Sequence, residues 1–462
     1  MNAVFLKDTI AAISTPAGVG AIGIVRISGP KSAEIGRLLF KPRRSDCRFE
    51  SHRLYHGDIL CPRTGKILDE ALFVFMKAPR TFTGEDSAEM HCHGGPVILQ
   101  RVLEEVVEAG ARPAEPGEFT RRAFLNNRLD LAQAEAVCDL ITARTEGGLE
   151  YALDQLKGTL SGRVREIREA VLQILVPIEA SIDFTEEELD TADDRVRLAP
   201  IDKVLDDLRV LLDTYREGRL LREGVSVVIA GRVNVGKSSL FNRLVGGKRA
   251  IVTPIAGTTR DLIEEGISID GLPVRLSDTA GLRETDNPIE KEGMAFVRER
   301  LLDADVVIVV LDGSEPLSPE DVRILEENRK RNILLVINKA DLPRRLAAEE
   351  LVNDMEFAQP LWISAKYGEG VDALKKRISN AARGGGSPRT PDTVLTALRH
   401  KVAVEKSIAL LSKAKEGLQG GLSPEYAAFD LRQAVESLDE ITGRNLSEEI
   451  LDQIFSNFCI GK

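Results

Sequence analysis

The stretch Gly231-Arg232-Val233-Asn234-Val235-Gly236-Lys237-Ser238 matches the pattern Gly-x-x-x-x-Gly-Lys-Ser, which is typical of a phosphate-binding P-loop. An apolar, β-branched run at residues 225–230 precedes it. Leu240, Phe241 and Leu244 follow at helical spacing. This order of strand, loop and helix predicts an α/β domain that binds a nucleotide.

The residues of the loop have separate expected roles. Its glycines let backbone N–H groups close around phosphate oxygens, and the N-terminus of the following helix adds positive charge. Lys237 is expected to reach the β- and γ-phosphates, and the Ser238 hydroxyl is expected to hold Mg²⁺. Val235, Gly236 and Ser239 are further expected contacts of the nucleotide.

Two switch-like motifs follow the P-loop. Asp278-Thr279-Ala280-Gly281 ends a strand-like run, where Asp278 is expected to bind Mg²⁺ through water and the Gly281 N–H to meet the γ-phosphate. Thr258-Thr259 lies between the two motifs, where a hydroxyl reaches Mg²⁺ only while the γ-phosphate is present. This arrangement predicts a nucleotide-dependent switch.

Two later motifs specify the base. In Asn338-Lys339-Ala340-Asp341, the Asp341 carboxylate is expected to accept hydrogen bonds from the N1–H and exocyclic amine of guanine. Adenine has no donor pair at that edge, so the motif favours GTP over ATP. Ser364-Ala365-Lys366 is its usual companion. The complete series predicts a Ras-like GTPase domain at residues 223–382.

The hydrolytic apparatus is less ordinary. Leu282 stands where many regulatory GTPases place a water-orienting glutamine. Glu284, Glu290 and Glu292 are candidates for that role, and the residues alone do not choose among them. No arginine finger is identifiable. The Asn234 side chain offers an oxygen to a monovalent cation that would supply the missing positive charge.

Bulk composition limits the class of protein. The 462 residues suggest about three domains, and the net charge of −11 argues against a protein that gains its main affinity from nucleic-acid phosphates. Five scattered cysteines without a Cys-x-x-Cys pair indicate a reduced, cytoplasmic protein. No apolar run is long enough to span a membrane.

The flanking regions predict two further kinds of domain. Residues 1–120 have an α+β pattern, with strands expected at 22–27 and 71–76 and a helix at 97–109. Residues 121–222 and 388–462 carry apolar stripes at helical spacing, and Pro177 is expected to kink one helix. Because such stripes need partners, the two segments are expected to pack together as one helical domain, with the nucleotide domain inserted between them.

These motifs resemble the MnmE (TrmE) family of tRNA-modification GTPases, among the TrmE-Era-EngA-like GTPases. The likeness covers essentially the whole chain, and its most specific element is the terminal Phe458-Cys459-Ile460-Gly461-Lys462. The other matching segments are residues 23–29, 82–86, 93–95, 116–121, 129–136, 231–238, 250–260 and 278–283. The resemblance implies a multidomain α/β protein whose N-terminal domain binds a reduced folate (methylene- or formyl-tetrahydrofolate) and mediates homodimerisation.

The resemblance also assigns residues. The folate positions are Arg26, Glu89, Arg128 and Lys462. Arg128 stands where other members use a lysine, which keeps the cation and changes its geometry. The potassium positions are Asn234, Thr253, Ile255 and Thr258, and the magnesium positions are Ser238 and Thr259. Glu290 matches the residue that orients the hydrolytic water. Cys459 matches a tail cysteine, which is either a reactive thiol or a packing residue of a docked tail.

The implied function is a potassium-dependent GTPase that modifies C5 of the tRNA wobble uridine. It acts with an FAD-containing MnmG-type partner, in a heterotetramer or a larger complex. The product would carry an aminomethyl or carboxymethylaminomethyl group. The alternative is a ribosome-assembly regulatory GTPase, which shares the P-loop, the base motif and Leu282. An RNA-binding Gly-x-x-Gly loop after the nucleotide domain is not apparent, which disfavours that alternative.

Overall fold

The computed structural model describes residues 8–44, 48–183, 194–246, 264–278, 304–347, 359–384 and 393–462. The chain divides into two compact units. One unit comprises Met1–Cys138, Leu156–Val164 and Glu436–Lys462, and the other comprises Asp139–Gln155 and Arg165–Val435. These units cut across the four segments expected from the sequence, so the limits of those segments stay a prediction.

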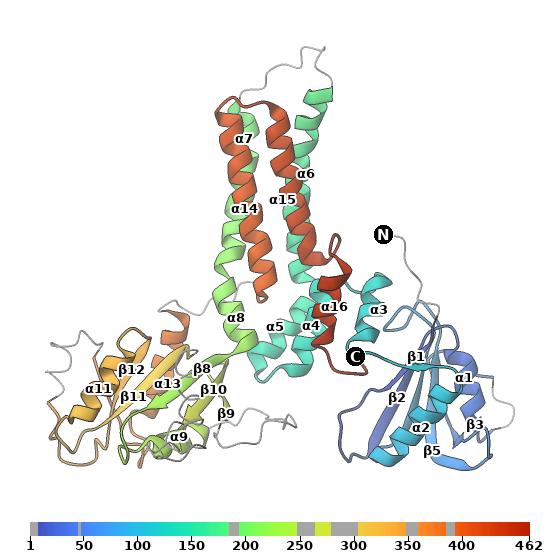
Figure 1. The fold of residues 1–462 in the computed structure, drawn as a ribbon, viewed down its shortest axis with the longest axis horizontal. Coiled ribbons are helices and arrows are strands. Elements are labelled where there is room, and N and C mark those ends of the chain that lie inside the picture. The colour runs from blue at the N-terminus through green and yellow to red at the C-terminus, as the bar shows by residue number, and fades with distance from the viewer. Residues whose placement is uncertain are drawn as a thin grey trace. The chain divides into compact units, whose positions relative to one another are not determined.

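The N-terminal region forms a seven-stranded sheet with the order β3-β4-β5-β6-β2-β1-β7 (Figure 1). Its strands are β1 (Ile10–Ile13), β2 (Ile22–Ser28), β3 (Phe40–Pro42), β4 (Arg53–Leu60), β5 (Ile67–Met76), β6 (Ser87–His93) and β7 (Arg112–Pro113). Neighbouring strands are antiparallel except for β1 and β7. Strand β5 begins earlier than the sequence suggested, because its first residues pair with β4.

Helices α1 (Ser32–Leu39) and α2 (Pro96–Glu108) cover one face of this sheet. Alternation along the strands supplies that face with apolar side chains. Val25 and Ile27 of β2 pack there with Met90 of β6, beneath Leu99 and Val102 of α2. Intervening residues on the opposite face stay partly accessible, such as Leu54 (53% exposed) and Leu72 (39% exposed). The sheet therefore has one covered face and one largely open face.

The helical elements lie on both sides of the nucleotide domain in sequence. The first group is α3 (Glu118–Leu125), α4 (Leu131–Thr142), α5 (Glu146–Leu156), α6 (Thr159–Asp183), α7 (Asp194–Asp213) and α8 (Tyr215–Glu223). The second group is α14 (Leu398–Gln419), α15 (Pro424–Thr442) and α16 (Glu448–Ser456). Helix α6 continues through Pro177. No described helix is long and apolar enough to cross a membrane.

The prediction that the two helical segments pack together is confirmed. Helices α6, α7, α14 and α15 run side by side (Figure 1). Lys415 of α14 contacts Asp202 of α7 at 2.5 Å, and Arg432 of α15 contacts Glu179 of α6 at 2.6 Å. The two segments of sequence thus form one helical layer interrupted by the nucleotide domain.

The nucleotide domain has a six-stranded sheet with the order β13-β12-β11-β8-β10-β9. Its strands are β8 (Val225–Ala230), β9 (Glu264–Ile269), β10 (Leu272–Asp278), β11 (Val306–Asp312), β12 (Ile333–Asn338) and β13 (Leu361–Trp362). Only β9 is antiparallel to its neighbour. Strand β11 is buried at every position, as expected of a central strand in a parallel sheet.

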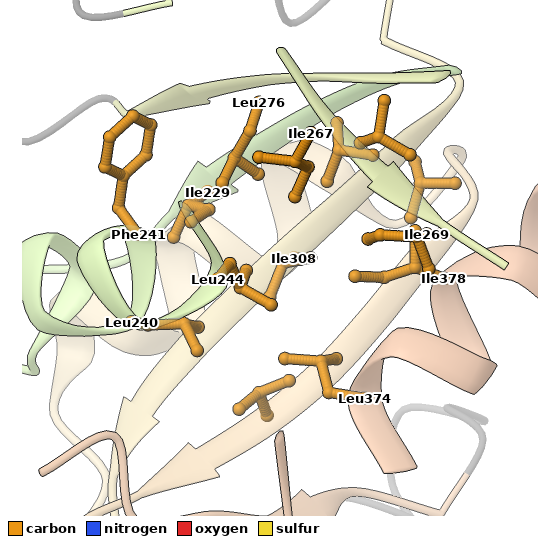
Figure 2. Packing of buried hydrophobic residues seen from close by; sticks show 14 of the residues in the cluster. Ile229, Leu240, Phe241, Leu244, Ile267, Ile269, Leu276, Ile308, Leu374 and Ile378 are labelled. Atoms are coloured by element: carbon orange, nitrogen blue, oxygen red, sulfur yellow. The ribbon is translucent and has the colours of Figure 1, made fainter. Parts of the chain in front are cut away.

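Helices cover both faces of this second sheet. Helices α9 (Lys237–Val245) and α13 (Val371–Arg383) pack on one face, where Leu240, Leu244 and Leu374 meet Ile229 and Ile308 (Figure 2). On the other face, Leu325 of α11 (Pro319–Asn328) packs in a separate apolar cluster. This layering brings the carboxyl ends of β8, β11 and β12 to one edge, where α/β sheets bind ligands.

Candidate functional site

The P-loop connects β8 to α9, and its backbone needs glycine at two points. Gly231 has φ +149° and Gly236 has φ +98°. A Cβ atom at Gly231 would lie 2.4 Å from the Val310 carbonyl oxygen, and one at Gly236 would lie 2.2 Å from Asn338 Nδ2. Asn234 also has a left-handed φ, +66°. The loop therefore adopts a curved backbone that side chains at the two glycines would block.

Lys237 and Ser238 open helix α9 immediately after this curve. The Lys237 ammonium donates to the Gly231 carbonyl at 2.6 Å and to the Arg232 carbonyl at 2.8 Å. Lys237 is buried, whereas Ser238 and Ser239 are exposed in the first turn. A buried ammonium, two exposed hydroxyls and a helix N-terminus thus follow one another in this short segment, and they are the donor set that phosphates and their metal require.

Asn338 joins the phosphate side of the site to the base side. Its Nδ2 donates to the Val235 carbonyl at 2.8 Å, and its Oδ1 accepts from the Ala365 backbone N–H at 2.9 Å. Asn338 is the last residue of β12 and is 3% exposed. One amide thereby links three of the predicted nucleotide motifs.

Asp341 and Ser364 meet as the sequence motifs suggested. The Ser364 hydroxyl donates to Asp341 Oδ1 at 2.6 Å. This hydrogen bond, with smaller contributions that include the charges of Lys366 and Lys339, holds the pKa of the Asp341 carboxyl below its ordinary value. Asp341 is thus kept ionised, as an acceptor of guanine N–H groups must be.

Two residues at the base side were missed by the sequence motifs. Asp312, the last residue of β11, accepts from Lys339 Nζ at 2.5 Å. Arg243 of α9 donates through Nε to the Ala365 carbonyl at 3.2 Å and also donates to the Lys366 carbonyl. An aspartate closing an all-apolar strand was a usable signal for Asp312, whereas nothing local marked Arg243.

Several predicted residues lie outside the described part of the chain. They are Thr253, Ile255, Thr258, Thr259, Thr279, Ala280, Gly281 and Glu290, together with Leu282, Glu284, Glu292 and the side chain of Asp278. The roles assigned to them in metal binding, switching and hydrolysis stay predictions.

A second polar cluster lies on the open face of the N-terminal sheet. Arg26 of β2 and Glu89 of β6 are opposite each other in the antiparallel register, and Arg26 Nε donates to Glu89 Oε1 at 2.8 Å. His91 Nε2 lies 3.2 Å from Glu89 Oε2. The Arg26 guanidinium also lies 5.9 Å from the Phe82 ring centroid and 5.8 Å from that of Phe119. These three partners, His91, Phe82 and Phe119, were not predicted as site residues.

The electrostatics of this cluster favour an ionised carboxylate. Burial acts to raise the pKa of Glu89, but hydrogen bonds and charge from His91 and Arg26 outweigh it and hold the pKa below its ordinary value. The carboxylate therefore remains an acceptor in a half-buried place.

The last residues of the chain dock beside β1. Gly461 has φ +91°, and a Cβ atom there would lie 2.5 Å from the Ile13 carbonyl oxygen. The Gly117 N–H donates to the Cys459 carbonyl at 3.3 Å, and the Cys459 thiol is free and exposed. Phe455 and Phe458 anchor the tail in an apolar cluster with Leu131, Ala134 and Leu451. The tail is therefore docked while the thiol of Cys459 stays accessible.

The other predicted residues of this cluster remain apart from its central pair. Arg128 lies beside Gly84, whose Cβ would be 3.2 Å from Arg128 Cγ. Among the described residues, no hydrogen bond or ion pair joins Arg128 or Lys462 to Arg26 or Glu89.

A P-loop domain with a guanine-type base motif, inserted into a helical layer and preceded by an α+β domain, defines a multidomain GTPase. Residues 9–128 match the family model described as GTP-binding protein TrmE N-terminus, and residues 131–459 match the model described as MnmE helical domain. The chain belongs to the MnmE (TrmE) family of tRNA modification GTPases.

Full-length relatives agree with this assignment. The tRNA modification GTPase MnmE of Syntrophus aciditrophicus (strain SB) is 51% identical over 457 residues, covering 99% of this chain and 100% of the relative. The protein of the same name from Natranaerobius thermophilus is 44% identical over 456 residues, with 99% and 100% covered. Among solved structures, the G domain of the T. maritima FeoB iron transporter is 30% identical and covers 34% of this chain and 98% of its own, with a TM-score of 0.28. The chain is therefore a GTPase that acts in tRNA modification.

Proposed function

We propose that this chain is a potassium-dependent GTPase that takes a one-carbon unit from a reduced folate for modification of C5 of the tRNA wobble uridine. It acts with an FAD-containing MnmG-type protein. The observation that carries the proposal is the Arg26–Glu89 pair on an open sheet face, within the domain to which the chain end docks. A GTPase needs no such site to hydrolyse GTP.

The residues present fit a folate. An ionised Glu89 suits the N–H donors of a pterin ring, and Phe82 offers an accessible aromatic surface at 38% exposure. Arg128 and Lys462 are cations suited to the carboxylates of the glutamate tail. When bound, methylene- or formyl-tetrahydrofolate supplies the one-carbon unit, and the protein residues bind and orient it.

The nucleotide site carries the metal assignments. Ser238 and Thr259 are the proposed Mg²⁺ ligands, and Asn234 with Thr253, Ile255 and Thr258 is proposed to hold K⁺. The exposed position of Asn234 in the P-loop supports this assignment, because an exposed amide can offer its oxygen to a cation near the phosphates. Glu290 is the proposed residue that orients the water.

Homodimerisation is proposed to involve the N-terminal domain. Its open sheet face carries accessible apolar side chains, including Leu54 and Leu72, beside the Arg26–Glu89 pair. Apolar side chains grouped on an exposed sheet face are typical of an interface. Cys459 is proposed as a reactive thiol, which its exposure at the docked tail supports.

Titration of the full-length protein with 5-formyltetrahydrofolate tests the folate assignment. We expect saturable binding that Glu89→Gln weakens by at least about tenfold, since a charge-assisted hydrogen bond is lost. Glu70→Gln on the same sheet face is the matched control and should bind like the wild type. Absence of binding in the wild type, or equal weakening by both variants, contradicts the proposal.

The potassium assignment has a separate test. GTP hydrolysis should be faster in KCl than in NaCl at matched ionic strength, and Asn234→Ala should remove the difference. Equal wild-type rates in the two salts contradict the cation site without affecting the folate assignment.

A further inference from the structure

We propose that residues 312–321 position the phosphate side and the base side of the nucleotide site relative to each other and so control nucleotide release. This segment, here called the bridge loop, runs from the last residue of β11 through the connecting loop into the first turn of α11. The bridge loop holds one cation from each side: Arg232 of the P-loop and Lys339 of the base motif. None of the nucleotide motifs includes this loop.

The base arm of the bridge loop is Asp312. This residue is 3% exposed and accepts from Lys339 Nζ at 2.5 Å and from the backbone N–H and hydroxyl of Ser314 at 2.9 and 2.6 Å. Next to it, the Gly313 N–H donates to the Asn338 carbonyl at 2.9 Å. Lys339 itself has φ +64°. The conformation of the base motif is thus tied to the bridge loop through both a side chain and the backbone.

The phosphate arm consists of Glu315 and Asp321. Arg232 donates to Glu315 Oε2, and its Nε lies 3.2 Å from Asp321 Oδ2. Asp321 is 1% exposed and is held by the capping box of α11, in which it bonds reciprocally with Ser318. A buried carboxylate that a helix cap fixes in place is a rigid anchor for the P-loop arginine.

The two arms have a common consequence. Three carboxylates of one short loop face two cations, and a buried carboxylate that loses its cation is strongly destabilised. The distances between the bridge loop, the P-loop and the base motif therefore stay fixed unless one of these ion pairs breaks. Opening the site for nucleotide release would require such a break, so these pairs act as positioning contacts for the bound nucleotide.

The two arms predict different effects on nucleotide release. Asp312→Asn tests the base arm, and Arg232→Met tests the phosphate arm. The first variant should loosen Lys339 and Asp341, so that GDP is released about tenfold faster and the preference for GDP over IDP, which lacks the exocyclic amine, declines. The second should release GDP and IDP faster by the same factor, leaving that preference unchanged.

Stopped-flow release of fluorescent GDP and IDP from the full-length protein measures both effects. Arg323→Met on α11 removes the same charge from a neighbouring element, outside the bridge loop, and should release both nucleotides at the wild-type rate. If Arg232→Met fails to fold, Glu315→Gln replaces it, because that side chain is 54% exposed. The proposal is overturned if Asp312→Asn releases GDP at the wild-type rate and keeps the wild-type preference for GDP over IDP. It is also overturned if Arg323→Met accelerates release as much as Asp312→Asn and Arg232→Met do.

Discussion

At the scale of the residue, base selection depends on how Asp341 is held. Asp341 is an exposed residue, so the hydrogen bond from Ser364 provides the orientation that packing does not. The serine belongs to the companion motif on the loop after β13, which explains why the two motifs occur together.

We predict that Ser364→Ala weakens GDP binding without abolishing it. Loss of one oriented hydrogen bond should raise the dissociation constant about three- to tenfold. Isothermal titration measures it, with Ser268→Ala on β9 as the control. An unchanged dissociation constant would show that the serine does not orient the carboxylate.

Arg122 is a second residue whose surroundings define its role. It is 1% exposed and contacts Asp8 at 2.8 Å, Glu118 at 2.9 Å and Glu85 at 3.2 Å. Arg112 adds a contact of 2.5 Å to Glu118. Burial acts to raise the pKa of Glu118, but hydrogen bonds from Arg112, the Glu115 backbone and Arg122 outweigh it and hold that pKa below its ordinary value.

This network predicts acid sensitivity of the N-terminal domain. A carboxyl whose pKa is lowered in the folded state stabilises the fold above its unfolded pKa, and this contribution is lost as pH falls through the folded value. The temperature of the thermal unfolding midpoint should therefore fall as the pH drops below 4.5, the ordinary pKa of a glutamate side chain. At pH 5 the Glu118→Gln variant should have a lower unfolding midpoint than the wild type, and its midpoint should fall less between pH 5 and about pH 3.

The control for this prediction is Glu104→Gln on α2, where the exposed carboxylate accepts from Arg101 and Gln100. It should follow the wild-type pH profile. Parallel profiles for all three proteins would contradict the assigned role of Glu118.

At the scale of the element, α8 is the joint between the helical layer and the nucleotide domain. Arg219 contacts Asp305 before β11 at 3.1 Å, and Arg222 contacts Asp139 of α4 at 2.9 Å. Arg383 at the end of α13 contacts Glu217 at 3.1 Å. This nine-residue helix leads from the helical layer into the nucleotide domain and contacts both, and Arg383 joins it to the end of the last helix of the nucleotide domain.

Gly218 of α8 lets the backbone at Leu395, which follows the nucleotide domain in sequence, pass close to this helix. A Cβ atom there would lie 2.1 Å from the Leu395 carbonyl oxygen. We predict that Gly218→Ala destabilises the protein by about 1–3 kcal/mol through overpacking, measured as a lower urea midpoint.

The matched control is Gly162→Ala in α6, where the added Cβ would have no described atom within 4 Å apart from its chain neighbours and the helix's own backbone. This change should be neutral or stabilising by up to about 1 kcal/mol, because alanine favours helix. A Gly218→Ala variant as stable as this control would contradict the close passage.

At the scale of the whole molecule, the chain end returns to the N-terminal domain. We predict that Gly461→Ala releases this tail, because the added Cβ would meet the Ile13 carbonyl oxygen at 2.5 Å. Carboxypeptidase removal of Lys462, followed by mass spectrometry, should become faster. Gly65→Ala has a similarly positive φ in open space and should leave the rate unchanged.

Sequence patterns predicted the parts that depend on local chemistry. The P-loop, the base motif and its companion are short, contiguous segments whose residue types are required by phosphate and guanine, so they could be read in order. Likewise, apolar stripes predicted that the two helical segments pack, because each stripe needs a partner. Residues 121–222 and 388–462 accordingly meet through α7 and α14.

Other parts depended on contacts between distant residues. The sequence alone determined a GTPase with flanking α+β and helical regions, because periodicity and motif spacing are local properties. Only the tertiary structure decided that Arg26 pairs with Glu89, that the Cys459 carbonyl meets Gly117, and that Asp312 holds Lys339. Strand register and chain return set these pairs, and neither leaves a periodic signal, since the same residues in another register would face other partners.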